Sequence, residues 1–496
     1  MECKGIKLSY AEHLFLMQLR RFRWVFCQLD ALRHCFPPNL RQYLNELPET
    51  LDETYERILK GINKAQRDNA HRLLQCLTVA VRPLLVEELA ELLAFDFRAS
   101  TAGGIPTLKE DWRWDDQEEA VLSICSSLIT IIPRDDSRVV QFSHFSVKEY
   151  LTSSRLARSQ HGEVSRFRID LEPAHTIMAK ASLATLLQLD EHASEYGAKM
   201  SPLVNYAAQH WVEHAQFGEV SSRVQEGMDD LFDNSRPHFA AWIRVHNIDE
   251  GWSFFSSDSQ DVGSPLYYAA FCGFYDLAER LIMEHPEQVN AQGGRSFAPL
   301  PAALYKGHFR IANLLHAHGA VVDVRGDKDY TPLYIASFWG EVDIMRWLLD
   351  RGADPSARSL HRTTPLSEAA FVLRLESVQV LLEHNADTNS HGIKGRTPLH
   401  TALDDPDTKS EGKLIEILRG LLEHGADPNI CDDLHRTPLH LASLYGILEA
   451  ARLLLSYGAK VDEKDGEGVT PFQVAGPRCR DEMKQLLLEH GAVPPP

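Results

Sequence analysis

A three-residue motif, Thr-Pro-Leu, recurs at nearly constant spacing through the second half of this 496-residue chain. Successive copies lie 33, 33 and 40 residues apart, and a related Thr-Pro-Phe follows after a further 33. A period of about 33 residues is typical of stacked helix pairs, because one such pair cannot bury its apolar face alone. Arrays of this kind bind other molecules and rarely catalyse reactions. The copies begin at Thr331, Thr364, Thr397, Thr437 and Thr470.

Two weaker copies of the motif extend the same register toward the N-terminus, at Ser264-Pro265-Leu266 and Ala298-Pro299-Leu300. Seven units are therefore predicted from about residue 260 to the C-terminus. In each unit Thr caps an inner helix, Pro occupies its first turn and Leu faces the core. A glycine such as Gly340 ends the inner helix, and a pair such as Gly352-Ala353 ends the outer helix, because glycine adopts the left-handed conformation without strain.

Two units depart from this pattern. Leu373 stands where the fourth unit should have its glycine, which predicts a changed turn between the two helices of that unit. The fifth unit has seven extra residues within Asp404 to Gly412, and their polar character predicts a longer loop. Insertions in repeat arrays usually lie in loops on one face of the array.

A histidine recurs near the end of the predicted outer helices. Neighbouring helices pack about 8 to 10 Å apart, whereas zinc lies about 2 Å from its ligands, so no metal site is predicted. A cation near a helix C-terminus is favoured by the helix dipole, which explains these histidines better. They are His285, His318, His384, His424 and His490.

Composition and charge argue against several classes of function. The chain has 44% hydrophobic and 24% charged residues and a formal net charge of -19, which disfavours binding to nucleic acid or anionic membranes. Its best candidate for a membrane span, Leu73 to Phe95, is interrupted by arginine, proline and glutamates. The eight cysteines form no Cys-x-x-Cys pair, and the N-terminus lacks the pattern of a signal peptide. A reducing, cytoplasmic location is therefore expected.

The N-terminal half predicts helices followed by a small β-hairpin. Apolar residues indicate helices around Leu73 to Leu77, at Val86 to Leu93 and at Val121 to Leu128. Ile129 to Ile132 and Val139 to Phe142 then alternate as strands. The turn between the strands is predicted at Pro133-Arg134-Asp135-Asp136.

Three helices and a hairpin suggest a winged helix. The second of these helices has three glutamates, Glu87, Glu88 and Glu91, and their repulsion of phosphate disfavours a DNA-reading role. Further helices are predicted at Ala174 to Asp190, Tyr206 to Gln216 and Pro237 to Trp242.

The repeated units resemble the ankyrin repeat, whose Thr-Pro-Leu-His motif is present at Thr397 to His400 and at Thr437 to His440. The resemblance covers nearly half of the chain. It implies that His400 and His440 hydrogen-bond within and between repeats and are structural rather than catalytic. It also implies that partners contact the β-turn tips and the two positions before the inner-helix glycine, which line a concave groove.

Aromatic residues dominate these groove positions. Trp and Tyr contribute most of the energy at many protein interfaces, so the stripe predicts a binding surface, with Trp339 and Tyr445 as its main anchors. The alternative is that several of these rings pack against the neighbouring repeat and only complete the core. The predicted groove residues are Phe271, Tyr305, Phe338, Trp339, Phe371 and Tyr445, and the predicted rim comprises Lys328, Tyr330, Lys394, Arg396 and Arg436.

Three segments of the N-terminal half resemble the region that follows the NTPase in fungal NACHT-ankyrin proteins of the STAND class: Phe22 to Leu29, Leu47 to Tyr55 and Phe142 to Leu151. That region includes a winged-helix domain, and the later helices resemble the family's linker. The expected fold is predominantly α-helical, an ankyrin-repeat solenoid preceded by a helical region with a winged helix. The implied divisions are a helical remnant at 1–60, a winged-helix domain at 61–160, a helical linker at 161–259 and ankyrin repeats at 260–496.

The phosphate-binding motif of such an NTPase, Gly-x-x-x-x-Gly-Lys followed by Ser or Thr, does not occur, because Gly412-Lys413 is followed by Leu414. The chain is therefore expected to begin after the NTPase core, either because the gene has lost that domain or because the coding region was assigned too late a start. His144 resembles the histidine by which the winged helix of related NTPases contacts nucleotide. Here it is a vestigial sensor candidate, and the alternative is a role in capping or packing.

These observations predict a non-enzymatic protein-protein interaction module that recognises a protein ligand through the concave groove. Gly-x-Ser-x-Gly and His-Glu-x-x-His motifs do not occur, and the paired carboxylates Asp404-Asp405 and Asp432-Asp433 fall in predicted loops or turns. No catalytic residue, metal, cofactor, small-molecule substrate, nucleic acid or membrane is expected. The alternative is that the chain is the C-terminal sensor and regulatory part of a NACHT-type signalling NTPase whose nucleotide-binding domain lies upstream.

Overall fold

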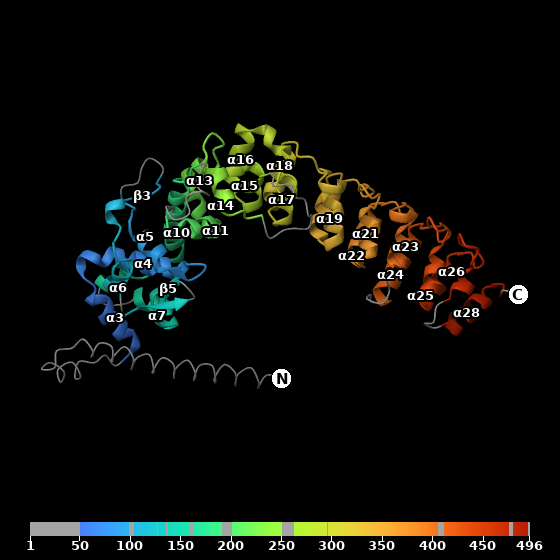
Figure 1. Ribbon diagram of the computed structural model, residues 1–496, viewed down its shortest axis with the longest axis horizontal. Helices are drawn as coiled ribbons and strands as arrows, with labels where there is room; N and C mark the ends of the chain where they lie inside the picture. The colour runs from blue at the N-terminus through green and yellow to red at the C-terminus, as the bar shows by residue number, and fades with distance from the viewer. Residues whose placement is uncertain are drawn as a thin grey trace. The chain divides into compact units, whose positions relative to one another are not determined.

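The computed structural model of the protein describes residues 50–98, 104–125, 127–134, 137–157, 162–190, 201–249, 262–294, 296–404, 411–475 and 480–494. The chain divides into two compact units, Met1–Gly251 and Trp252–Pro496 (Figure 1). The described residues are predominantly helical, as predicted. Most of the predicted helical remnant at 1–60 lies outside these ranges. None of the helices in the described ranges is long and apolar enough to cross a membrane.

The first unit begins with helices that share one core with a small sheet. α3 starts with a capping box, in which the Thr50 hydroxyl accepts from the Glu53 N–H and the Glu53 carboxylate accepts from the Thr50 N–H. Leu73 and Leu89 are fully buried in the core with Val140. These helices are α3 (Leu51–Gly61), α4 (Arg67–Val79), α5 (Val86–Leu93), α6 (Gln117–Cys125), α7 (Phe145–Thr152), α8 (Ser154–Ala157) and α9 (Gly162–Ser165). The predicted winged helix is confirmed, although its third helix begins and ends earlier than predicted.

The main sheet of the first unit is antiparallel and has the strand order β1-β5-β4. β4 (Ile129–Arg134) and β5 (Ser137–Phe142) form the predicted hairpin. The prediction that Pro133 and Arg134 belong to the turn is wrong, because both continue β4 and Pro133 pairs with Arg138. Proline is tolerated there because β4 is an edge strand. The short strands β1 (Leu84–Leu85), β2 (Phe95–Asp96) and β3 (Thr107–Leu108) have no sequence prediction.

Helix α5, the predicted acidic helix, is enclosed by the rest of the domain. All of its residues except Glu87 are buried. Glu88 accepts two hydrogen bonds from the Arg82 guanidinium, at 2.8 and 2.5 Å, and Glu91 accepts two from Arg113, at 2.9 and 2.5 Å. Phosphate repulsion is therefore the wrong reason for disfavouring DNA. The helix is unavailable to a DNA groove because it is buried, and two of its three carboxylates are already neutralised by arginines.

In the described residues of the first unit, five α-helices follow the winged helix. Their core is aromatic, with the rings of Trp211 and Trp242 5.3 Å apart and the rings of Phe232 and Trp242 5.8 Å apart. The buried indole of Trp242 donates to the Ala208 carbonyl at 3.0 Å, which ties the last of these helices to the second. The five are α10 (Leu171–Leu186), α11 (Val204–Ala215), α12 (Val220–Arg223), α13 (Gln225–Phe232) and α14 (His238–Val245).

The described residues of the second unit form seven helix pairs, which confirms the predicted number of repeats. In the third pair, the Thr331 hydroxyl accepts from the Tyr334 N–H at 3.2 Å, and Gly340 closes the inner helix at φ +84°. The inner helices are α15 (Pro265–Cys272), α17 (Pro299–Tyr305), α19 (Pro332–Trp339), α21 (Pro365–Phe371), α23 (Pro398–Ala402), α25 (Pro438–Tyr445) and α27 (Pro471–Val474). The outer helices are α16 (Tyr275–Glu284), α18 (Phe309–Ala317), α20 (Val342–Leu349), α22 (Leu375–Glu383), α24 (Glu411–Glu423), α26 (Leu448–Ser456) and α28 (Arg480–Glu489).

The predicted change of turn at Leu373 is wrong. Leu373 adopts φ +52°, in the same left-handed region as the glycine it replaces. The hydrogen bond across the turn is also kept: Arg374 N donates to Ala369 O at 2.9 Å, as Glu341 N does to Ala336 O at 3.0 Å. A leucine is strained in this region. Because its side chain is only 8% exposed, burial offsets the backbone strain and the turn keeps its shape.

Two residues of the segment that contains the insertion of the fifth unit belong to a helix. Residues 405–410 lie outside the described ranges. Glu411 and Gly412 belong to α24, which has 13 residues, whereas α22 and α26 have 9 each. The prediction that this whole segment is loop is therefore wrong at its C-terminal end, where Glu411 begins the helix and places a carboxylate in its first turn.

Candidate protein-binding surface

Two adjoining pockets lie where the inner helices α19 and α21 meet the turn tips beside them. The first, of about 170 Å³, is lined by residues of α19, two turn-tip residues and Glu368 of α21. The second, of about 370 Å³, extends toward the fifth repeat. The pockets share Tyr330, Tyr334 and Glu368. We call these two pockets the aromatic groove. The first pocket is lined by Lys328, Tyr330, Tyr334, Ile335, Phe338, Trp339 and Glu368.

Tyr334 fixes one wall of the aromatic groove. It stands three residues after the capping Thr331, where two later repeats have His400 and His440. Its hydroxyl donates to the Glu368 Oε2 at 2.6 Å and accepts from the Thr363 hydroxyl at 3.3 Å, so one ring links the third repeat to the fourth. The Tyr330 ring stacks on it with centroids 4.4 Å apart and planes 22° apart. Two aromatic faces are therefore held in place by the fold.

Glu368 supplies the only carboxylate among the residues that line the first pocket. Burial raises its pKa, and the hydrogen bond from Tyr334 lowers it. Burial also raises the pKa of Tyr334, and the neighbouring Glu368 raises it further, so the phenol stays protonated as the donor. Glu368 is therefore half-buried, and its carboxyl group is oriented by a neutral hydroxyl.

The groove residues predicted from sequence differ in exposure. The side chains of Trp339 and Phe371 are 39% and 41% exposed, and Tyr445 is half-buried. Phe338 is half-buried and meets Trp339 edge to face with centroids 5.3 Å apart. Each of these four rings therefore keeps part of its surface exposed, and Phe371 lies in a different repeat from Phe338 and Trp339.

The two remaining predicted groove residues are held by neighbouring side chains or repeats. Phe271 is 7% exposed, and the Lys306 ammonium lies 4.2 Å from its ring centroid. The half-buried Tyr305 donates its hydroxyl proton to the Pro332 carbonyl of the next repeat at 3.0 Å. For these two rings the structure favours the alternative reading, in which they complete the packing between repeats.

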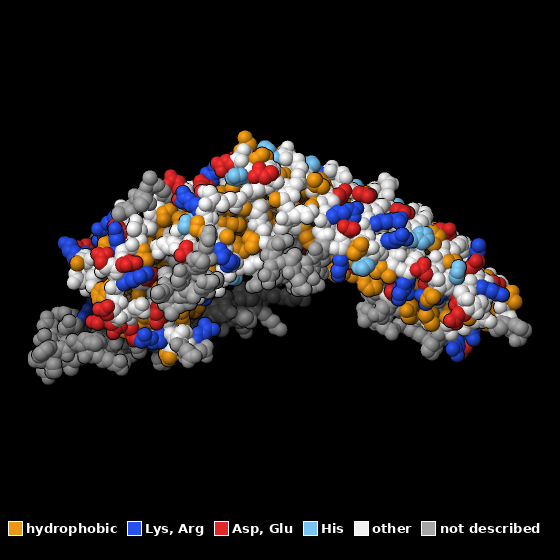
Figure 2. Space-filling model, turned by 45° about the horizontal axis from the view of Figure 1, so that its top comes forward, with side chains coloured by type: hydrophobic (Ala, Val, Ile, Leu, Met, Phe, Trp, Pro, Cys, Tyr) orange, Lys and Arg blue, Asp and Glu red, His pale blue; other side chains and the backbone are white. Residues whose placement is uncertain are grey.

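The predicted rim residues also divide into two groups. Lys328 and Lys394 are exposed at turn tips, with φ of +56° and +59°. Arg396 forms an ion pair with Asp404, and Arg436 donates to the buried Asp432 at 3.0 and 2.7 Å. The two arginines therefore stabilise turns, while the two lysines remain at the mouth of the groove. On the face shown in Figure 2, acidic and basic side chains are interspersed.

Sequence reasoning missed Tyr334, Ile335 and Glu368 as groove residues. One signal was present: Tyr334 replaces histidine in the Thr-Pro-Leu-His motif. Glu368, the fourth residue after Thr364, stands where other repeats have Ile335, Thr401 or Leu441. A carboxylate at a position that is otherwise apolar or uncharged is therefore the feature that distinguishes this part of the array.

The histidines of the repeat motif have the structural role that the resemblance implies. The His440 Nδ1 accepts from the Thr437 N–H at 3.1 Å, and its Nε2 donates to the Val469 carbonyl at 3.1 Å. His400 makes the same two kinds of contact, with Thr397 and with the Arg436 carbonyl at 2.9 Å. The prediction that both histidines bond within and between repeats is confirmed.

The histidines at the ends of outer helices bond to their own helices. The Nδ1 atoms of His384, His424 and His490 each donate to the carbonyl four residues earlier, at 2.9 Å. Each of these carbonyls also accepts from the backbone N–H of the same histidine, so the side chain adds a second bond at the end of the helix. Across the residues that the structure describes, no three His, Cys, Asp or Glu side chains are grouped to hold a metal ion.

His144, the vestigial sensor candidate, caps helix α7. Its Nδ1 accepts from the Ser146 N–H at 3.2 Å and lies 2.6 Å from the Ser146 hydroxyl. Ser146 in turn lies 2.8 Å from the Tyr55 hydroxyl, which connects the cap to helix α3. These contacts fit the alternative role for His144, in which it caps the helix.

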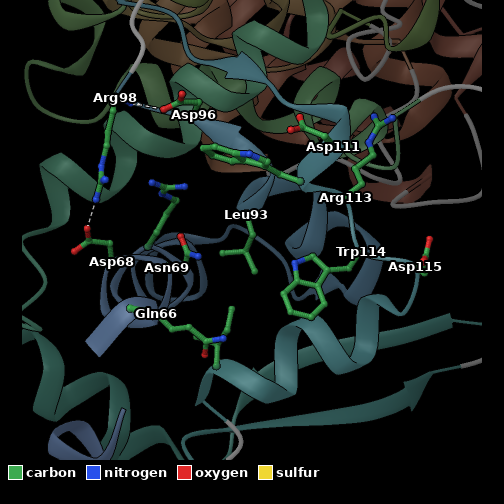
Figure 3. Close-up of a pocket in the computed structure, with 14 residues that line it drawn as sticks. Gln66, Asp68, Asn69, Leu93, Asp96, Arg98, Asp111, Arg113, Trp114 and Asp115 are labelled. Carbon is green, nitrogen blue, oxygen red and sulfur yellow. Dashed lines mark hydrogen bonds and ion pairs between the residues drawn. The ribbon is translucent and has the colours of Figure 1, made fainter. Parts of the chain in front are cut away.

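A further pocket, of about 660 Å³, lies in the winged-helix domain (Figure 3). Trp112 and Trp114 are each 45% exposed at its edge. The three arginines that line it are already engaged: Arg98 forms an ion pair with Asp68, Arg113 pairs with the buried Glu91, and Arg72 donates to the Phe95 carbonyl at 3.0 Å and lies over the Phe97 ring. Carboxylates also line it, so it offers neither a free cation for an anionic ligand nor a strongly apolar floor. The aromatic groove is the better candidate for a binding surface.

Comparisons with known proteins agree with both parts of this architecture. Residues 266–359 and 408–495 match the family of ankyrin repeats (3 copies), and residues 55–164 match the winged helix domain of GPI inositol-deacylase. A curated relative, azaphilone pigments biosynthesis cluster protein L of Monascus ruber, is 33% identical over 296 residues. That match covers 56% of this chain, and the chain spans 61% of the length of the relative. The protein thus contains ankyrin repeats preceded by a winged-helix domain of the GPI-inositol-deacylase type.

Proposed function

We propose that the protein is a non-enzymatic interaction module that recognises a protein ligand through the aromatic groove and the neighbouring inner helices. Ankyrin repeats themselves point to protein partners and are not catalytic. The specific support is the exposure of Trp339 and Phe371 beside two adjoining pockets, on a face that inner helices and turn tips build together. Large rings that are rigidly held and partly exposed lose little conformational entropy when a partner covers them.

The proposal predicts that Trp339→Ala combined with Tyr445→Ala abolishes capture of the partner. The full chain would be immobilised, partners would be recovered from a cell extract, and the dissociation constant of the recovered partner would be measured for each variant. We expect a loss of at least about 100-fold, because each anchor ring contributes about 2 kcal/mol at a typical hot spot. The midpoint of thermal unfolding should fall by less than about 8 °C, since both rings are only partly buried.

A matched control removes two exposed side chains on the outer-helix side of the array: Met283→Ala, in α16, with Tyr457→Ala, directly after α26. These side chains are 70% and 41% exposed. Capture by this control should equal that of the wild type. Equal losses of binding in the two double variants would refute the proposed surface, and unfolding of the Trp339 and Tyr445 variant would show that those rings belong to the core.

A second function is favoured by the winged-helix match at residues 55–164. Under this second proposal, the chain is the C-terminal sensor and regulatory part of a NACHT-type signalling NTPase in the cytoplasm. The aromatic groove would then be the part that senses the ligand and regulates the NTPase. The domain limits 1–60, 61–160, 161–259 and 260–496 belong to this proposal. Sequence upstream of the chain discriminates between the two functions: an in-frame Gly-x-x-x-x-Gly-Lys-Ser/Thr motif supports the signalling NTPase. Binding of the partner by this chain alone, without nucleotide, supports the independent module.

A further inference from the structure

We infer that the first pocket of the aromatic groove holds an arginine side chain of the protein partner, with its guanidinium between the aromatic walls and the carboxylate of Glu368. The inference rests on the proposed function and specifies the chemistry that the groove recognises. It combines three observations: the shape of the pocket, the rings that line it, and a carboxylate whose second oxygen is available.

The pocket has the size and the walls for one planar cation. Its volume of about 170 Å³ accommodates a single large side chain rather than a small-molecule cofactor. Tyr330 and Tyr334 stack 4.4 Å apart, and Phe338 and Trp339 meet at 85°, so the pocket has rings in two orientations. The faces of aromatic rings carry negative potential, and a guanidinium is attracted to them within about 6 Å of the ring centroid.

Glu368 gives the pocket its charge preference. Its Oε2 accepts a hydrogen bond from the Tyr334 hydroxyl, while within the described ranges its Oε1 has no hydrogen bond or ion pair. The carboxylate is partly removed from water without a cation beside it, which is unfavourable for the ionised group. A guanidinium that donates to Oε1 would supply the missing counter-charge, and Arg binds carboxylates with good geometry because its N–H groups form a planar fork.

Lys328 is a cation that lines the same pocket as the Glu368 carboxylate. The test must therefore distinguish a cationic from an anionic partner group. Lys328 lines the pocket but forms no recorded ion pair with Glu368 in the described part of the chain, and its side chain is exposed. An exposed lysine can move toward water when a cation enters. If the pocket accepted a carboxylate from the partner instead, Lys328 would be the attractive group and Glu368 the repulsive one. The two substitutions therefore have opposite effects under the two possibilities.

The test uses the full chain labelled with 5-fluorotryptophan. The resonance of Trp339, one of eight tryptophans, would be assigned from its loss in Trp339→Phe. The ¹⁹F spectrum would be followed during titration with acetyl-arginine methylamide, with its neutral isostere acetyl-citrulline methylamide, and with acetyl-glutamate methylamide. We expect the arginine derivative to shift the Trp339 resonance with a dissociation constant about tenfold lower than that of the citrulline derivative.

Two pocket variants and one control complete the test. Glu368→Gln should reduce the preference for arginine over citrulline to less than about twofold; its amide oxygen can still accept from Tyr334, so the wall is preserved. Lys328→Glu should tighten binding of the arginine derivative several-fold. Glu376→Gln, on the exposed side of α22, should change neither value.

Equal binding of arginine and citrulline derivatives would overturn the inference, as would tighter binding of the glutamate derivative or no response of Trp339 to any of the three. Capture of the protein partner by the wild-type chain is measured independently of these titrations. So is its loss in the Trp339 and Tyr445 double variant. Failure of the arginine site is thereby distinguished from failure of the proposed function.

Discussion

Replacement of His440 by alanine is expected to lower the free energy of unfolding of the last repeats by about 3 kcal/mol. His440 is 1% exposed, and its two ring nitrogens bond to different repeats: Nδ1 accepts from Thr437, and Nε2 donates to the Val469 carbonyl. Alanine removes both bonds, leaves the N–H of the buried Thr437 without its acceptor and creates a cavity, whereas the Val469 carbonyl keeps its bond from the Asp465 N–H. Because each repeat is stabilised by its neighbours, loss of this bridge should release α27 and α28 first.

Hydrogen exchange of the amides in α25 to α28, combined with urea unfolding, would measure this effect. His361→Ala is the matched control, because His361 is exposed at a turn tip and should change stability by less than about 0.5 kcal/mol. His440→Gln should fall between the two. In the seventh repeat Gln473 caps the Thr470 N–H at 2.9 Å, so glutamine restores the cap and is too short to restore the bridge to the next repeat. A His440→Ala variant as stable as His361→Ala would contradict the role assigned to the bridge.

The repeat architecture could be predicted from sequence because its determinants are local and periodic. Thr at the cap and Pro in the first turn specify each inner helix from adjacent residues, and both recur in register. The errors arose where tertiary context prevails over local preference. Leu373 keeps a glycine-like turn because its side chain is buried, and Pro133 continues a strand because that strand lies at an edge.

The candidate site was less predictable, because it depends on contacts between repeats. Trp339 and Phe371 follow from position in the repeat, and their exposure agrees with that reasoning. The role of Glu368 does not follow from its position in the repeat. It depends on a hydrogen bond from the hydroxyl of Tyr334, which lies 34 residues earlier in the chain. The same limit applies to Arg396 and Arg436: sequence identifies two cations near turn tips, and only the structure shows that Asp404 and Asp432 neutralise them.

A buried histidine in each unit makes the protein sensitive to acid. His214, in α11, is fully buried, with its Nδ1 2.8 Å from the His175 Nδ1 and its Nε2 2.9 Å from the Tyr206 hydroxyl. Burial, together with smaller effects of the neighbouring His175 and His210, lowers the pKa of His214 to about 3. In the second unit, burial lowers the pKa of His400 to about 4, against weaker opposing effects from the Arg436 carbonyl and Asp432.

Acidification from pH 6.5 to 5.0 is therefore expected to cost each unit about 2 kcal/mol of unfolding free energy for its buried histidine. The sign follows from proton uptake: below about pH 6.5 the unfolded chain protonates these imidazoles, whereas the folded chain does not until near pH 3 or 4, so falling pH favours unfolding. Calorimetric unfolding at several pH values between 7.5 and 5.0 would give the slope of stability against pH for the full chain.

The slope of unfolding free energy against pH, rather than the stability at one pH, distinguishes protonation of a histidine from loss of its packing contacts. His214→Gln and His400→Gln each disturb contacts and lower stability at every pH, yet each should flatten the slope for its own unit by about 1.4 kcal/mol per pH unit below pH 6.5, because glutamine takes up no proton. His361→Gln removes an exposed imidazole and should leave both slopes unchanged. An unchanged slope in His214→Gln would mean that His214 is not the group that titrates. The lowered pKa values of His175 and His440 act in the same direction, so some slope should remain in each single variant.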